Sequence, residues 1–418
     1  MKLLFLVDMV FKDKPGGSRV VARELARGLA QRGHEITLLA ARATPQAPEV
    51  EEQDGIRVVR YEAGSNPISF VRQGRRACAK LQAEHGFDLV HVHFAYSAVG
   101  PLQALGLRVP RLRFFHGAWD EEGWVEDQTH LQSLSRIQAP KRQILQLKSR
   151  LKRAVRRQIE VRNLQQNQKV VVLSEFMRGE ANVRGVLPEN VHLIPGGTDV
   201  KRFLPAADPK AIRAALGLPA DCRVLLSVRR LAKRMGLDNL IQAMPAVLAR
   251  YPDALLLIGG QGPEQKSLAK MIQDLKIEAN VRLLGFIPDD QLVQYYQAAD
   301  VFVLPTVALE GFGLVTTEAL ACGLPVIGTP VGATPEILGG LEPRLITRGS
   351  APQNLSEAII GYFAEDWSRA LTRERLRRYV LDNYTWDAHI NAVEAVSLAL
   401  VHQSGIPRPT ERSLSEKA

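Results

Sequence analysis

Two glutamates and two glycines lie close together in the second half of the chain. Glu310 begins the run Glu-Gly-Phe-Gly, and Glu318 follows after seven intervening residues. The apolar residues 301–304 predict a buried parallel strand, and residues 314–322 have the spacing and composition of a helix. Glycines ahead of a helix let the backbone approach a ligand, and the unpaired N–H groups at the helix start favour a phosphate. The stretch therefore predicts a phosphate site between two carboxylates.

The two carboxylates restrict the kind of ligand that this site can take. Beside an anionic ligand, a carboxylate is attracted to hydroxyl groups and repelled by phosphates. A ligand with hydroxyl groups at both ends and phosphates between them is a nucleotide sugar. A simpler reading stays open for each residue, because Glu310 also fits a charge at a helix N-terminus and Glu318 a solvated helix surface.

Residues 310–326, which read EGFGLVTTEALACGLPV, resemble the signature of the retaining glycosyltransferases of family 4. The resemblance implies an α/β protein of the GT-B class, with two Rossmann-like, doubly wound domains that face each other across a cleft. It also implies that Glu310 orients the hydroxyls of the donor sugar, that Glu318 holds the ribose, and that no metal or other cofactor takes part. The other residues expected to contact the donor here are Gly311, Phe312, Gly313, Leu314 and Val315.

Cations for the donor diphosphate are expected after the strand predicted at residues 222–228. In the resembling family, an arginine and a lysine five residues later hold the diphosphate. Arg230 matches the arginine and would act as a catalytic group on the leaving phosphate, whereas Met235 stands in place of the lysine. We expect Lys233 or Arg234 to supply the missing charge. An ordinary surface charge remains the alternative for Arg230.

Two further donor contacts follow from the same resemblance. Gly260 begins the Gly-Gln-Gly-Pro turn after the strand predicted at residues 254–259, and Ile287 lies in the Phe-Ile-Pro segment expected at the nucleobase. The turn is not a dinucleotide fingerprint, because Gln265 stands where the third glycine would be. A phosphate-binding P-loop is also excluded, since the chain has no Gly-Lys pair.

The first half of the chain supplies the residues expected on the acceptor side. Gly16 and Gly17 match a Gly-Gly loop of the resembling family near the acceptor and the donor diphosphate, although a plain turn fits them too. His93 and His116 stand at the carboxyl ends of predicted strands, where ligands gather in open α/β sheets. By the resemblance, His116 approaches the sugar or the acceptor and is a catalytic candidate, with a structural histidine as the alternative. Trp119 begins a polar loop expected at the acceptor.

The composition fits two α/β domains in a reducing compartment. The chain has 418 residues, 46% of them hydrophobic, and no apolar run approaches the length of a membrane span. Its three cysteines are scattered, which argues against a disulfide framework or a metal site. We expect an N-terminal acceptor domain over residues 1–199, a nucleotide-sugar domain over 200–385, a helix over 386–403 that crosses back to the first domain, and a disordered tail over 404–418.

A basic amphipathic helix is predicted at about residues 140–168. Its lysines and arginines far outnumber the one acid, Glu160, and apolar residues recur at helical spacing. Each basic group near an anionic lipid surface contributes about 1 kcal/mol, so the helix predicts a cytoplasmic protein held on the inner face of a membrane. The solvated face of an ordinary helix is the alternative. Nucleic acid is not expected as a partner, because no aromatic residues are interleaved with the charges.

The residues and the resemblance predict a retaining hexosyltransferase of glycan or exopolysaccharide assembly. Its donor would be a UDP- or GDP-sugar, and its acceptor a glycan or a lipid-linked sugar. Two other classes stay open. One is a nucleotide-sugar epimerase or phosphorylase on the same fold. The other is a non-catalytic basic protein that binds membranes or polyanions and keeps a relict sugar site.

Overall fold

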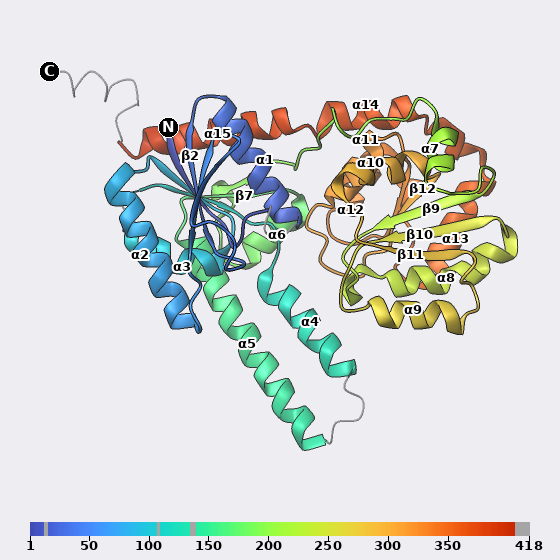
Figure 1. Ribbon diagram of the computed structural model, residues 1–418, viewed down its shortest axis with the longest axis horizontal. Helices are drawn as coiled ribbons and strands as arrows, with labels where there is room; N and C mark the ends of the chain where they lie inside the picture. The colour runs from blue at the N-terminus through green and yellow to red at the C-terminus, as the bar shows by residue number, and fades with distance from the viewer. Residues whose placement is uncertain (12–15, 107–108, 134–138, 406–418) are drawn as a thin grey trace. The chain divides into compact units, whose positions relative to one another are not determined.

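The computed structural model describes residues 1–11, 16–106, 109–133 and 139–405, which form two compact units (Figure 1). The chain leaves the first unit between Gly196 and Gly197 and returns to it at Trp386. The segment from Glu121 to Leu147 groups with the second unit rather than the first. The predicted tail over 404–418 lies outside the described residues from residue 406 onward.

The sheet of the first unit has eight strands in the order β3-β4-β2-β1-β5-β6-β7-β8. Neighbouring strands are parallel except β3 and β4, which form an antiparallel edge. The central strands are short, almost continuous apolar runs, because both of their faces are covered. The strands are β1 (Lys2–Leu6), β2 (Glu35–Ala41), β3 (Val50–Gln53), β4 (Ile56–Tyr61), β5 (Leu89–Val92), β6 (Arg111–Phe114), β7 (Lys169–Val172) and β8 (Val191–Leu193).

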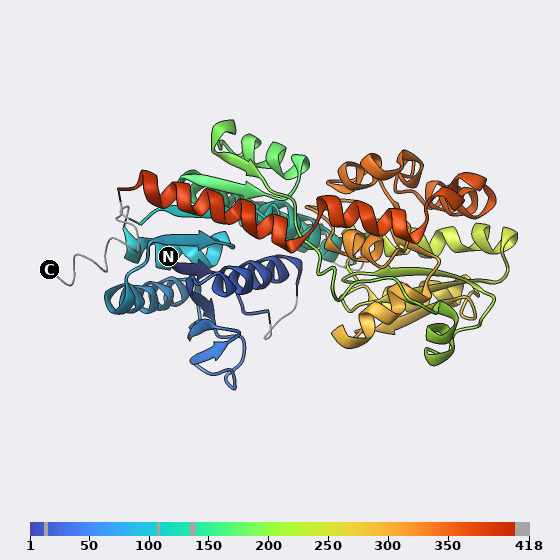
Figure 2. The same cartoon turned by 90° about the horizontal axis from the view of Figure 1, so that it is seen from above.

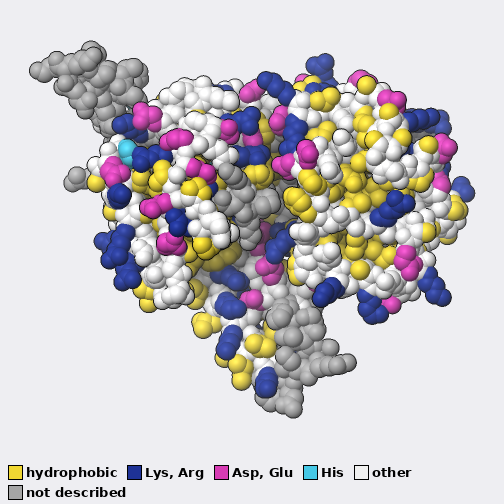
Figure 3. Space-filling view, in the orientation of Figure 1, with side chains coloured by type: hydrophobic (Ala, Val, Ile, Leu, Met, Phe, Trp, Pro, Cys, Tyr) yellow, Lys and Arg dark blue, Asp and Glu magenta, His cyan; other side chains and the backbone are white. Residues whose placement is uncertain are grey.

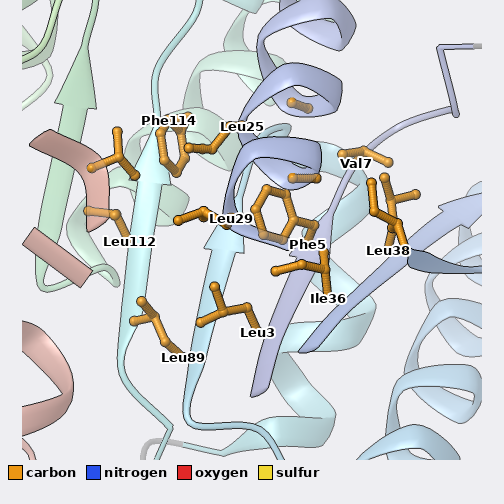
Figure 4. Close-up of a cluster of buried hydrophobic side chains, with 14 of the residues drawn as sticks. Leu3, Phe5, Val7, Leu25, Leu29, Ile36, Leu38, Leu89, Leu112 and Phe114 are labelled. Atoms are coloured by element: carbon orange, nitrogen blue, oxygen red, sulfur yellow. The ribbon is translucent and has the colours of Figure 1, made fainter. Parts of the chain in front are cut away.

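Alternate side chains of β1 belong to two separate hydrophobic clusters, one on each face of the sheet. Leu3 and Phe5 pack with residues of α1 and α15 (Figure 4), and Leu4 and Leu6 pack with residues of α2 and α3. Both faces of β1 are therefore buried, so this strand lies in the interior of the first unit. The helices of this unit are α1 (Gly17–Gln31), α2 (Pro67–His85), α3 (Ala95–Leu105), α6 (Glu175–Val183), α15 (Trp386–Gln403) and the short η1 (Pro188–Asn190).

The last helix, α15, packs against α1 in the first unit (Figure 2). Gly28 of α1 allows this approach, since a Cβ atom there would lie 2.2 Å from the Cδ1 atom of Ile390. His389 adds a polar contact, because its Nδ1 atom lies 2.7 Å from the carbonyl oxygen of Pro195. The C-terminal end of the described chain is therefore part of the first hydrophobic core.

Two long helices, α4 (Trp119–Ser133) and α5 (Ala139–Gln165), connect β6 to β7. The prediction of a polar loop at Trp119 is wrong, since Trp119 and the residues after it begin α4. The acids that follow Trp119 favour a helix N-terminus, which explains why a polar run is helical here. α5 occupies most of the range of the predicted basic helix, and its one acid, Glu160, is buried against Arg113 at 2.7 Å.

The second unit contains a parallel five-stranded sheet in the order β11-β10-β9-β12-β13. Its strands are β9 (Arg223–Val228), β10 (Ala254–Gly259), β11 (Val281–Gly285), β12 (Val301–Leu304) and β13 (Val326–Gly328). Its helices are α7 (Pro209–Ala215), α8 (Leu237–Arg250), α9 (Gln265–Asp274), α10 (Asp289–Ala298), α11 (Leu314–Ala321), α12 (Thr334–Leu341), α13 (Pro352–Ala364) and α14 (Arg373–Asn383). Short turns of 3-10 helix are η2 (Lys233–Met235), η3 (Pro343–Leu345) and η4 (Asp366–Ala370).

The strand order places β9 and β12 side by side in the middle of this sheet, so the loops that follow them meet at its carboxyl edge. The loop after β9 carries the predicted cations, and the loop after β12 carries Glu310. Within the described residues, no helix is long and apolar enough to cross a membrane.

Candidate functional site

Glu310 lies in the loop between β12 and α11 and is buried. Its Oε2 atom accepts hydrogen bonds from Arg229 Nη2 and from the Thr306 hydroxyl, the latter at 3.0 Å. Its carbonyl oxygen accepts from the Ala333 N–H at 2.9 Å. Gly332 is required beside it, because this glycine has a φ of +57° and a Cβ atom there would lie 2.0 Å from that carbonyl oxygen. The position of Glu310 is therefore fixed by both its backbone and its side chain.

The loop passes from Glu310 into α11 through a left-handed glycine. Gly313 has a φ of +84° and caps α11, a conformation that favours glycine. The helix begins at Leu314, and its first amides, including that of Val315, have no intrahelical acceptor. Phe312 is buried with an edge-to-face contact to Tyr384 at 5.8 Å. The glycine loop and helix start that the sequence predicted are both present.

Glu318 lies one turn inside α11 and accepts a hydrogen bond from the Tyr296 hydroxyl at 3.0 Å. Burial raises the pKa of Glu318 to about 7. The carboxyl group is therefore poised between its neutral and ionised forms near neutral pH. Both glutamates flank the start of one helix, as the sequence suggested.

The predicted phosphate cations follow β9 and pair with carboxylates of α4. Arg230 Nη1 lies 2.6 Å from an oxygen of Glu126, and both side chains are about half exposed. Arg234 Nη2 lies 3.2 Å from Glu122, whose pKa is raised by burial. Arg230 and Arg234 thus both pair with carboxylates of α4.

The two residues proposed to replace the missing lysine behave differently. Arg234 is mostly buried and also donates to the carbonyl oxygen of Leu309 at 3.0 Å, so its side chain reaches the Glu310 loop. Lys233 is half exposed and pairs with Asp238 of α8 instead. Met235 itself is buried in the hydrophobic interior. Of the two candidates, Arg234 is the one whose side chain contacts the loop.

The remaining predicted donor residues lie after β10 and β11. Gly260 has a φ of +129°, and a Cβ atom there would lie 1.8 Å from the Arg229 carbonyl oxygen, so the two loops touch through backbone. Ile287 is buried and packs against Gly259. Its neighbour Phe286 is 56% exposed. If a nucleobase binds at this segment, Phe286 offers it the exposed ring.

In the first unit, the two predicted histidines form a pair at the carboxyl ends of β5 and β6. His93 Nδ1 lies 3.1 Å from His116 Nε2, and the two rings stack with centroids 5.3 Å apart. His93 also stacks on Phe114. Burial lowers the pKa of His116 to about 3 and that of His93 well below its usual value. Both imidazoles are therefore uncharged at neutral pH.

Trp119 and the glycine pair lie elsewhere in the first unit. The Trp119 ring contacts those of Phe94 and Tyr96, each with centroids 5.7 Å apart. Gly16 and Gly17 stand at the start of α1, where the Gly16 carbonyl oxygen accepts from two amides of the first turn. The rest of the expected Gly-Gly loop, residues 12–15, lies outside the described residues.

Two residues that contact Glu310 were not foreseen from the sequence, namely Arg229 and Thr306. Thr306 is buried, and the Arg229 side chain has an exposed fraction of 5%. The pair of arginines after a buried strand was the available signal for Arg229. Among the described residues, no group of three or more His, Cys, Asp or Glu side chains could hold a metal ion. The metal-free reaction stays a prediction.

Two family models match the chain, one for each half. Residues 15–202 match the family described as Glycosyltransferase Family 4, and residues 208–380 match the family described as Glycosyl transferases group 1. Together these matches cover most of both units. The residues predicted for the donor site and those predicted for the acceptor side fall within them.

The names of similar proteins refer to a nucleotide-sugar donor and to phosphorylated or lipid acceptors. A GDP-mannose-dependent monoacylated alpha-(1-6)-phosphatidylinositol monomannoside mannosyltransferase of Corynebacterium glutamicum is 36% identical over 211 residues, which are 49% of this chain and about half (54%) of that protein. A D-inositol 3-phosphate glycosyltransferase of Kineococcus radiotolerans is 30% identical over 76% of this chain and 73% of its own length. Among solved structures, a sucrose-phosphate synthase of Thermosynechococcus elongatus has a TM-score of 0.77 at 25% identity, over 96% of this chain and 100% of that one.

Proposed function

The chain belongs to the glycosyltransferases of family 4 and has the GT-B fold, and we propose that it is a retaining, metal-independent hexosyltransferase with a lipid-linked or polysaccharide acceptor. The observation that carries the proposal is the placement of Glu310 and Glu318 on either side of the α11 start, beside the arginines that follow β9. This arrangement offers carboxylates that can accept hydrogen bonds from hydroxyl groups at two points, with arginines beside the Glu310 loop.

The proposed reaction needs a stabilised leaving diphosphate and a held sugar. The first amides of α11, with Arg230 and Arg234, would offset the negative charge that develops on the diphosphate. Glu310 would accept a hydrogen bond from a hydroxyl of the hexose, and Glu318 from the ribose. The new glycosidic bond would form on the face that the diphosphate leaves, with the leaving phosphate oxygen taking the acceptor's proton. No side chain has to serve as a nucleophile in this scheme.

We propose the inner face of an anionic membrane as the place of action, on the strength of α5. Its exposed apolar residues alternate with lysines and arginines (Figure 3). The apolar residues are Ile144, Leu147, Leu151 and Val155, all more than half exposed. Apolar side chains between basic ones fit the interface of an anionic bilayer. The lipid acceptor named for the Corynebacterium glutamicum relative agrees with such a location.

Donor binding is tested with a thermal-shift panel of guanosine, uridine and adenosine diphosphate sugars, beginning with GDP-mannose. A donor at about 100 times its dissociation constant stabilises the native state by about 2.7 kcal/mol. We expect a shift with one nucleotide class in the wild type that is lost in Glu318→Ala. Glu357→Ala, which removes an exposed glutamate of α13, is the matched control. No shift with any donor, with or without acceptor, would contradict the proposal.

Transfer and membrane binding have separate tests. A transferase releases free nucleotide only when an acceptor is present, whereas an epimerase or phosphorylase does not need that acceptor, and the anomeric configuration of the product reports retention. For the membrane, we expect the triple reversal of Lys148, Arg150 and Lys152 to glutamate to abolish cosedimentation with anionic vesicles. The control reverses three exposed arginines of α2, namely Arg72, Arg75 and Arg76. Equal binding by both triple variants would exclude α5 as the anchor.

A further inference from the structure

We propose that Arg229 is the positioning residue for Glu310, and that it leaves Glu310 one oxygen, Oε1, to accept a hydrogen bond from a neutral sugar hydroxyl. The proposal rests on the proposed function and adds the residue that makes its sugar contact directional. Arg229 is outside the set of donor residues that the sequence predicted. The argument comes from three side chains at the carboxyl edge of the second sheet.

Arg229, Thr306 and Glu310 form a closed set of hydrogen bonds. Arg229 Nη1 donates to the Thr306 hydroxyl, and Arg229 Nη2 donates to Glu310 Oε2. The Thr306 hydroxyl in turn donates to the same Oε2 atom at 3.0 Å. Glu310 Oε2 thus receives two donors, and Thr306 is fully buried. Each of these side chains restricts the other two.

The backbone of Arg229 is held by the neighbouring loop after β10. Its N–H donates to the Gly259 carbonyl oxygen at 2.9 Å, and its own carbonyl oxygen lies where a Cβ atom of residue 260 would be. The side chain is 5% exposed, and its guanidinium group is engaged by Thr306 and Glu310. Arg229 is therefore placed to act on a ligand through Glu310.

The second oxygen of Glu310 has a different environment. Among the described residues, no hydrogen bond to Oε1 is found, and this atom lies 3.6 Å from the point where a Cβ atom of Gly313 would be. Oε1 therefore faces the start of α11, which is the place proposed for the diphosphate and the sugar. A carboxylate oxygen accepts and does not donate. The group that it selects is a hydroxyl.

Charge balance explains why an arginine is needed at this place. A buried carboxylate without a cation is strongly unfavourable. It would also repel the diphosphate of the donor. Pairing with Arg229 makes the two side chains neutral together, while Oε1 keeps its ability to accept a hydrogen bond. Arg230 and Arg234 are thereby left to act on the phosphates.

The test is a double-mutant cycle on the full chain with the donor found in the thermal-shift panel. Arg229→Ala is expected to lower kcat about 100-fold, while the donor KM changes less than about threefold. Glu310→Gln is expected to lower kcat similarly. In the Glu310→Gln background, Arg229→Ala is expected to lower kcat by less than about threefold more, because its target is already lost. Millimolar guanidinium ion is expected to restore part of the Arg229→Ala activity.

Controls separate positioning from folding. Arg223→Ala removes a half-exposed arginine from the other end of β9, where it pairs with Asp253, and is expected to leave kcat unchanged. If Arg229→Ala does not fold, Arg229→Lys, which keeps the charge but forms fewer hydrogen bonds, completes the cycle.

Three outcomes would overturn the inference: wild-type kcat in folded Arg229→Ala, effects of Arg229→Ala and Glu310→Gln that multiply independently, or loss of kcat with no guanidinium rescue and a matching loss of thermal stability. Wild-type kcat in Glu310→Gln would instead overturn the proposed function itself. The two failures are therefore distinguishable.

Discussion

The carboxyl edges of the two sheets differ in how they present charge. In the second unit, the arginines after β9 pair with carboxylates, Arg229 with Glu310 of the loop after β12, and Arg230 and Arg234 with Glu126 and Glu122 of α4. In the first unit, β5 and β6 end in two stacked histidines, His93 and His116, that burial keeps uncharged. An edge of paired charges suits a diphosphate, whereas an edge of neutral imidazoles suits a ligand with hydroxyl groups.

In the first unit, two buried ion pairs have a structural role. Arg113 pairs with Glu160, and Arg184 pairs with Asp120, in each case with both side chains at most 2% exposed. The first pair joins α5 to strand β6, and the second joins the start of α4 to the end of α6. Similar residue types therefore serve structure in one unit and, in our proposal, ligand binding in the other.

The largest effect is expected from breaking the buried pair of the first unit. Glu160→Ala should lower the free energy of unfolding by about 3–5 kcal/mol, because it leaves the Arg113 charge buried without a partner. Urea unfolding measures it. Lys270→Ala, which removes an exposed ion pair with Asp274, is the control and should change stability by less than about 1 kcal/mol. A loss below about 1 kcal/mol in Glu160→Ala would remove the contrast between the two units.

The next effect concerns the charges of the second unit. Glu310→Ala and Arg230→Ala should each cost about 3 kcal/mol of transition-state stabilisation, which is a loss of about two orders of magnitude in kcat/KM. Steady-state kinetics on the folded variants measures it. Because Arg230 is exposed, Arg230→Ala should lower the free energy of unfolding much less than Glu160→Ala does. Wild-type turnover in either variant would contradict the assignment of the site.

The pH dependence of stability tests the neutral histidines. A third buried histidine, His91, lies within β5, and burial lowers its pKa to about 3, below the value of about 6.5 in the unfolded chain. The unfolded state therefore binds more protons, and stability is complete above about pH 6.5 and falls as the pH drops toward 3. Each such histidine should contribute a loss of about 1.4 kcal/mol per pH unit in that window.

His91→Phe removes one of these titrating groups and keeps a ring beside Phe5 and Phe114. Urea unfolding at several pH values should give a shallower slope for this variant, by about 1.4 kcal/mol per pH unit between about pH 5.5 and 4.5. An unchanged slope would show that the buried imidazole does not set the acid sensitivity of the first unit.

The smallest effect is on donor affinity and comes from Glu318, whose pKa is raised to about 7 by burial. The ionised form is the better acceptor for the ribose hydroxyls, so donor affinity should rise with pH, by up to about tenfold between pH 6 and 8. Isothermal titration calorimetry measures it. Glu318→Gln should bind donor more weakly and without this pH dependence. A wild-type affinity that falls with pH would contradict the proposed role.

In the second unit, sequence patterns predicted the strands and helices well but did not predict the contacts between loops. Strands β10 and β12 lie where the apolar runs placed them, and Gly313 caps α11 because that turn has a positive φ. These features depend on local residue types. The pairing of Arg229 with Glu310 does not, because it joins two loops 81 residues apart in the chain. Periodicity identifies elements, but only the sheet order shows which loops meet.

The first unit shows the same limit. The histidines at the ends of β5 and β6 were recognised as candidates from their position, but their stacking and neutrality depend on burial. α4 was missed because its hydrophobic pattern is weak and its acidic start resembles a loop. The choice between Lys233 and Arg234 was likewise left open by the sequence, since adjacent residues on a helical turn point in different directions.

If the donor binds as we propose, the ion pairs between α4 and the loop after β9 compete with its diphosphate. Glu122 and Glu126 hold Arg234 and Arg230 when no diphosphate is bound. A donor that takes these arginines releases two carboxylates, so its net electrostatic gain is the difference between two sets of ion pairs. By reciprocity, whatever holds α4 away from the arginines strengthens donor binding, and bound donor frees α4 to the same extent.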